Sequence, residues 1–242
     1  EKLCSFRFAN LRHSGNLSLV AGMDDSGRML CNAIHIVDKT PSGFEMYAGG
    51  GTRGCAHDIG KVVRDISGDG NLELVVDVDF TPFQGPVHCE ATWPLIYAWT
   101  GAGYTNVSGR FKGFYEHEVE SLNQQMAALP PSDTAKTPYY QHDCLSAEIA
   151  KIRRAMGGSP EAGLSDAIAL ARDADPERRY FAAALLIDIG TPDALKYLRP
   201  LIGDSDRSVA DLASRGLSGM GGYPVPTFRR EPLAGTRLGP AK

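Results

Sequence analysis

Oxygen-bearing side chains recur at fixed spacing in one short stretch, and this stretch constrains the fold of the chain more than any other. Asp65, Ser67, Asp69 and Glu73 stand at relative positions 1, 3, 5 and 9, and Gly70 stands at position 6. Hard cations such as Ca²⁺ take six to eight oxygen ligands from a tight loop, and glycine permits the backbone reversal that such a loop requires. The spacing therefore predicts a cation-binding loop.

The sequence after the loop differs from that of an EF-hand. An EF-hand carries a bidentate Glu at position 12 and continues as a helix. Position 12 is Val76 here, and the sequence alternates as a strand does, with Leu74, Val76 and Val78 on one face and Asp77 and Asp79 on the other. The loop is therefore predicted to open a β-strand.

A segment near the N-terminus repeats the loop pattern. Asn10, Arg12, Ser14 and Ser18 occupy the positions that carry the oxygen ligands 55 residues later in the chain. An arginine at position 3 would repel a divalent ion. We therefore expect the first copy to keep the turn without the metal chemistry.

The pattern D-x-S-x-D-G-N-x-E-L-V-V resembles the FG-GAP or VCBS repeat, the calcium-loop blade of integrin-type β-propellers, and the later segment W-P-L-I-Y-A-W-T-G-A-G-Y-T-N-V-S resembles the ending that often follows it. The resemblance implies a structural Ca²⁺ held by Asp65, Ser67, Asp69, Glu73 and the carbonyl of Asn71. A closed propeller needs four to eight blades. The chain has room for two, so we expect an open sheet or a small sandwich.

The two halves of the chain have different periodicities, which predicts an α+β protein. Residues 1–115 contain segments in which apolar and polar residues alternate, separated by turns rich in glycine and asparagine. We expect them to form an antiparallel β domain. Residues 116–220 carry apolar residues at helical spacing. Residues 221–242 are rich in proline and glycine, and we expect an extended or disordered tail there.

The helical half contains an internal repeat of 31 residues, in which 161–186 aligns with 192–217. Each copy reads as a helix, an Asp-bearing turn and a second helix with small inward residues. These copies resemble short HEAT repeats of the phycobilisome-lyase type, which implies a protein-binding surface on the helices. Asp175 and Asp206 are expected to be helix N-caps.

The cysteines favour an oxidising compartment. Four of the five, Cys4, Cys31, Cys55 and Cys89, lie in the first ninety residues, and none forms a CxxC pair. This distribution suits one or two disulfides, with an odd thiol left over, in an extracellular or periplasmic protein that has lost its signal segment. The alternative is a set of unrelated thiols in a cytosolic protein.

Two functions from different classes remain open. The net charge of −4 gives no reason to expect a nucleic-acid partner, and no apolar run is long enough to span a membrane. The first function is a non-enzymatic calcium-binding module that interacts with a protein partner. The alternative is a secreted hydrolase or carbohydrate-acting protein that uses Asp77, Asp79, Glu90 or His57. Trp93, Tyr97 and Trp99 alternate and could stack sugars, although core packing is the simpler expectation.

Overall fold

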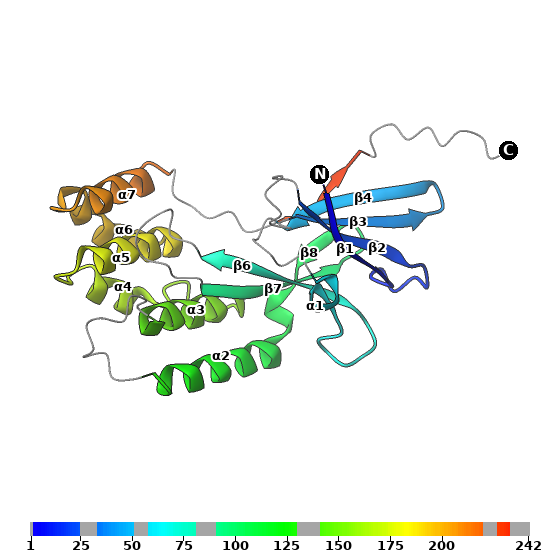
Figure 1. Ribbon diagram of the computed structural model, residues 1–242, viewed down its shortest axis with the longest axis horizontal. Helices are drawn as coiled ribbons and strands as arrows, with labels where there is room; N and C mark the ends of the chain where they lie inside the picture. The colour runs from blue at the N-terminus through cyan, green and yellow to red at the C-terminus, as the bar shows by residue number, and fades with distance from the viewer. Residues whose placement is uncertain are drawn as a thin grey trace. The chain divides into compact units, whose positions relative to one another are not determined.

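Two antiparallel sheets and a set of helices make up the chain, so the α+β class predicted from the sequence is confirmed. The structure, a computed structural model, describes residues 2–24, 33–50, 58–80, 91–129, 141–219 and 227–232. The chain divides into two units (Figure 1). The first comprises residues 1–78, 94–108 and 225–242, and the second comprises residues 79–93 and 109–224.

The larger sheet has five strands in the order β1-β2-β3-β4-β9. Their bounds are Lys2–Ala9 for β1, Ser18–Asp24 for β2, Ala33–Thr40 for β3, Gly43–Gly50 for β4 and Arg229–Glu231 for β9. One face carries Val20, Ile34 and Ile36, which are fully buried. Their alternation with less buried neighbours reflects the two-residue period of a strand.

The smaller sheet has four strands in the order β5-β6-β7-β8. They span Val63–Arg64, Glu73–Phe80, Ala91–Trp99 and Tyr104–Asn106, and the short helix α1, Ile59–Val62, precedes them. In β6, Leu74, Val75 and Val76 are all buried. Both faces of this strand are therefore covered, which accounts for an apolar run in place of strict alternation.

The strand β9 lies in the segment that the sequence predicted to be an extended or disordered tail. It pairs with β4, with Arg230 opposite Tyr47. Phe228 precedes it, and its ring lies 5.1 Å from that of Tyr97. A Cβ atom on Gly49 would meet the Phe228 ring at 2.7 Å, so only glycine allows this close approach.

Helices α4 to α7 form the repeated part of the second unit, and α2 and α3 precede them. The bounds are Lys112–Ala127 for α2, Gln141–Ala155 for α3, Leu164–Leu170 for α4, Pro176–Ile189 for α5, Pro192–Leu198 for α6 and Arg207–Leu217 for α7, with 3-10 turns η2 at Ser108–Arg110 and η3 at Arg199–Gly203. Helix α5 is buried along most of its length, and α4, α6 and α7 pack against it. A helix that is buried on all sides forms the core of its unit.

The second helices of the two 31-residue copies begin in the same way. Asp175 caps α5 by accepting a hydrogen bond from the Glu177 amide, and Asp206 caps α7 by accepting from the Ser208 and Val209 amides. The two N-cap predictions are therefore confirmed. Ala182 and Ala213, at matching positions, are fully buried, so small residues allow the helices to approach closely.

Candidate cation loop and the polar network of the first unit

The two segments that the sequence aligned have matching turns. His13 and Gly68, at equivalent positions, have φ values of 55° and 73°, and Gly15 and Gly70 have φ values of 79° and 84°. The left-handed region suits glycine and is uncommon for histidine. Each turn is followed by a strand, β2 in the first copy and β6 in the second.

A side-chain hydrogen bond also repeats. The Asn16 amide donates to Ser14 Oγ at 3.4 Å, and the Asn71 amide donates to Asp69 Oδ1 at 2.8 Å. The strands then begin at Ser18 and Glu73, and both of these polar side chains are buried. The repeat inferred from the sequence is therefore a repeat of conformation.

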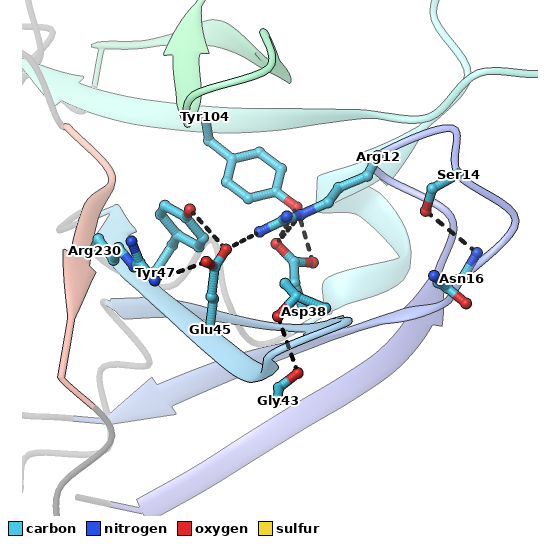
Figure 2. A network of polar contacts seen from close by, with 10 residues as sticks. Arg12, Ser14, Asn16, Asp38, Gly43, Glu45, Tyr47, Tyr104 and Arg230 are labelled. Carbon is cyan, nitrogen blue, oxygen red and sulfur yellow. Dashed lines mark hydrogen bonds and ion pairs between the residues drawn. The ribbon is translucent and has the colours of Figure 1, made fainter.

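The first turn places an arginine among carboxylates, as Figure 2 shows. Arg12 Nε lies 2.6 Å from Asp38 Oδ2, and its Nη2 lies 2.8 Å from Glu45 Oε2. Tyr104 Oη donates to Asp38, with both carboxylate oxygens at 3.1 Å. Arg230 reaches the other oxygen of Glu45 at 2.7 Å. These contacts connect the first turn with β3, β4, β8 and β9.

Aromatic rings enclose the same guanidinium group. The Arg12 Cζ atom lies 3.8 Å from the Trp99 ring centroid and 5.7 Å from that of Tyr47. Burial acts to lower the pKa of Arg12, but the hydrogen bonds to Glu45 and Asp38 outweigh it and raise that pKa. Arg12 therefore acts as a permanent internal cation for the two carboxylates.

The second turn has carboxylates and backbone amides in close contact. Asp65 Oδ1 accepts from the Gly68 amide at 2.7 Å, and Oδ2 accepts from the Gly70 amide at 2.9 Å. Asp69 accepts from Asn71 at both oxygens. Glu73 Oε2 accepts from the Ile66 amide at 3.1 Å. These hydrogen bonds fix the loop on the strand that it opens.

The charges of the second turn repel one another. Burial, followed by the charges of Asp69 and Asp65, raises the pKa of Glu73, although the hydrogen bond from the Ile66 amide acts in the opposite direction. Asp69 is exposed, and hydrogen bonds from Asn71 and Ser67 lower its pKa. His13, from the first turn, favours the charged form of both Asp69 and Glu73. The two turns are therefore close enough to interact electrostatically.

The oxygen ligands of the second turn are of the types that bind a hard cation, but their present arrangement is not a complete metal site. Carboxylate, amide and hydroxyl oxygens are the ligands of Ca²⁺, and each oxygen of Asp65 keeps a lone pair after accepting one amide. However, no group of three or more His, Cys, Asp or Glu side chains in the described part of the chain could hold a metal ion.

The other residues singled out in the sequence do not form a site among the described residues. Asp77 is exposed on β6, while the side chain of Asp79 and the whole of His57 and Glu90 lie outside the described residues. The cysteines Cys31, Cys55 and Cys89 also lie outside them. Trp93 and Tyr97 are buried, as expected for core packing.

No pattern in the sequence marks Asp38, Glu45 or Tyr104 as members of a network. They come from three strands and meet only through the fold, so no local spacing marks them. One signal was present in the first turn, where Arg12 stands at a position that a cation loop gives to an oxygen ligand. A positively charged arginine at such a position indicates that carboxylate partners lie elsewhere in the chain.

The second unit has its own buried ionic cluster. Lys151 Nζ and Arg154 both contact Asp188, with Arg154 Nη2 at 2.5 Å, and Lys151 Nζ lies 4.3 Å from the Trp93 ring centroid. Burial and the Arg154 charge lower the pKa of Lys151 to about 7, whereas the Asp188 carboxylate favours its charged form. The cluster holds α3 against α5.

Comparison with known proteins gives no relative. No protein-family model matches the chain, and neither a curated protein nor a solved structure is significantly similar to it. Within the described residues, no helix combines the length and the apolar character that crossing a membrane requires.

Proposed function

We propose that the chain is a non-enzymatic module in which Ca²⁺ stiffens the loop 65–73 and whose surfaces bind a protein partner. The observation that carries this proposal is the pair of matching turns. The first turn contributes a guanidinium to two carboxylates, and the second gathers Asp65, Asp69 and Glu73, whose charges repel one another. An external cation would relieve this repulsion in the second turn as Arg12 does in the network of the first.

The role of the ion would be structural. Asp65, Ser67, Asp69, Glu73 and the Asn71 carbonyl would hold it, and the ion would neutralise their combined charge. Because Glu73 is the first residue of β6 and is buried, neutralising its carboxylate would favour the conformation in which the strand is paired. No chemical step is assigned to the site.

The helical repeats are the proposed partner surface, in line with their resemblance to HEAT repeats. Such repeats stack along one axis and present extended faces to partners. The outward residues of α7, Arg207, Asp211 and Arg215, are exposed and charged. A charged and exposed helix surface of this kind suits contacts with a protein partner that are both hydrated and selective.

Calcium should raise the thermal midpoint of the EGTA-stripped protein. A ligand that binds only the folded state at ten times its Kd adds about 1.4 kcal/mol to the free energy of unfolding, which corresponds to a few degrees for a chain of this size. Differential scanning calorimetry measures the shift. Asp69→Ala should abolish it because this change removes one of the three carboxylates.

Ser14→Ala is the matched control, since Ser14 holds the equivalent position and makes the equivalent hydrogen bond in the first turn. It should leave the calcium shift unchanged.

The pH dependence of the free energy of unfolding adds a second readout. Because the pKa of Glu73 is raised, the folded state binds more protons than the unfolded state at pH values just above the ordinary pKa of 4.5. The free energy of unfolding should therefore fall as pH rises through this range. Bound Ca²⁺ should suppress that fall. A wild-type midpoint unmoved by Ca²⁺ would sink the metal assignment.

We also propose that cysteines of the chain form disulfide bonds. Support comes from Cys4 in β1 and Cys144 in α3, which are bonded as half-cystines rather than free thiols. One disulfide among the five cysteines leaves three thiols, and two disulfides leave one. Titration of the denatured, unreduced protein with a thiol reagent should therefore give one or three reactive groups per chain, and prior reduction should give all five. Five reactive groups without reduction would exclude the extracellular or periplasmic assignment.

A further inference from the structure

The larger sheet has an apolar face that is open to solvent. Five large apolar side chains are more than half exposed, namely Leu3 at 52%, Phe6 at 58%, Phe8 at 57%, Leu17 at 58% and Phe44 at 55%. The remaining large apolar side chains with high exposure among the described residues, Tyr197 and Ile202, belong to the helical unit. Exposure on this scale is unusual for a surface that stays in water.

The strand register places these five side chains on one face. Leu3 is opposite Met23, Phe8 is opposite Leu19, and Phe44 is opposite Lys39. Residues directly opposite each other share a face, and residues two apart do so as well. Leu17 and Leu19 therefore share the face of Phe6 and Phe8, and Leu19 continues to Val37 in β3. We call this surface the outer face.

The register also separates the outer face from the core. Val20, Ile34 and Ile36 are fully buried, and they alternate with the outer-face residues Leu19, His35 and Val37. Arg7, which points away from the outer face, donates from its Nη1 to the Val63 carbonyl at 3.1 Å. The polar network around Arg12 also belongs to the inner side. The exposed rings are therefore not part of the core of their own unit.

We propose that the outer face is the interface of a homodimer, in which a second copy of the chain packs its own outer face against it. The available area matches this occupant. A Phe side chain buries about 150–250 Å² in full, so the three half-exposed rings offer roughly 300 Å². With the neighbouring Leu, Met and Val side chains the area is on the order of 600 Å² per copy, or about 1,200 Å² for a pair, within the range of stable interfaces.

The charges of the face are self-complementary, and a sheet face suits packing against a second sheet. Two pleated sheets pack face to face with their side chains interdigitated. At one edge, Arg229 lies opposite Ala48 and Glu231 opposite Met46, so both charges lie on the outer face, two residues apart. In a two-fold interface each residue meets its counterpart reciprocally, which allows Arg229 to pair with Glu231 of the second copy. A partner of strong single-sign charge would find no such match.

Sedimentation equilibrium of the full chain tests the proposal. The wild type should have twice the chain mass of 26.0 kDa at micromolar concentration, both in Ca²⁺ and in EGTA, which separates this result from that of the calcium experiment. The double variant Phe6→Glu and Phe8→Glu should raise the dimer Kd by about 100-fold or more, because each copy would bury two charges. Ile202→Glu, which places a charge at a 46% exposed apolar position in the helical unit, should leave the mass doubled.

Further variants keep the result clear. Leu17→Lys with Phe44→Lys alters the other end of the outer face and should also give monomers, so a folding defect in one variant does not end the test. Arg229→Glu should weaken the dimer several-fold, and adding Glu231→Arg should restore it. A monomeric wild type, a dimer insensitive to both double variants, or a dimer lost in Ile202→Glu would each overturn the proposal. Wild-type monomers that bind a different protein through this face would overturn it too.

Discussion

Arg12→Met should lower the free energy of unfolding by about 3–5 kcal/mol, the effect of removing one partner from a buried ionic network. The change leaves Asp38, only 1% exposed, next to Glu45 with no guanidinium between them. Methionine keeps much of the apolar contact with Trp99, so the loss reports the charge rather than the volume. Urea unfolding followed by Trp fluorescence is the measurement, and a Trp93→Phe background makes Trp99 the only reporter.

Arg230→Met is the matched control because it also removes an arginine from Glu45. The Arg230 side chain is 66% exposed, and an ion pair that is so well solvated contributes at most about 1 kcal/mol. Arg12→Met combined with Asp38→Asn and Glu45→Gln should recover part of the loss, since neutral side chains need no buried counter-charge. Equal destabilisation by Arg12→Met and Arg230→Met would contradict the role given to Arg12.

Local patterns were sufficient to predict the two repeats. The turn residues of 10–18 and 65–73 determine backbone conformation over a few positions, so alignment of the letters predicted a matching turn. Gly15 and Gly70 both have positive φ, in keeping with it. The same holds for Asp175 and Asp206, because an N-cap depends only on the amides of the next three residues. The change from strand to helix period near residue 116 also predicted the α+β class.

Long-range pairing was not predictable in this way. Strand β9 has only three residues, and it exists because β4 offers an open edge and Gly49 leaves room for Phe228. Strand β1 carries exposed Phe6 and Phe8 where a surface strand is expected to be polar, which weakens its local signal. The network around Arg12 joins positions that are 26 and 33 residues apart. The arrangement of the cation loop likewise depends on side-chain rotamers, which spacing does not determine.

In the helical unit, Asp204→Ala should lower the free energy of unfolding by about 3 kcal/mol, because the half-enclosed Arg179 guanidinium loses its bidentate carboxylate contact and keeps hydrogen bonds to backbone carbonyls. Asp204 accepts two hydrogen bonds from Arg179, each at 2.8 Å, and a third from the Asp206 amide at 2.8 Å. Arg179 belongs to the first repeat and Asp204 to the second, so the contact joins neighbouring repeats. Helical circular dichroism during urea unfolding measures the loss.

The pH dependence of this loss distinguishes a charge contact from simple packing. The hydrogen bonds from Arg179 lower the pKa of Asp204 below its ordinary value of 3.8. A carboxyl with a lowered folded pKa stabilises above the unfolded value, and its contribution is lost as pH falls through the folded value. The wild type and Asp204→Ala should therefore differ fully at neutral pH and converge in acid. Asp193→Ala, which removes an exposed carboxylate paired with Lys196, should match the stability of the wild type at every pH. If the difference in stability between the wild type and Asp204→Ala did not change with pH, the contact would contribute through packing alone.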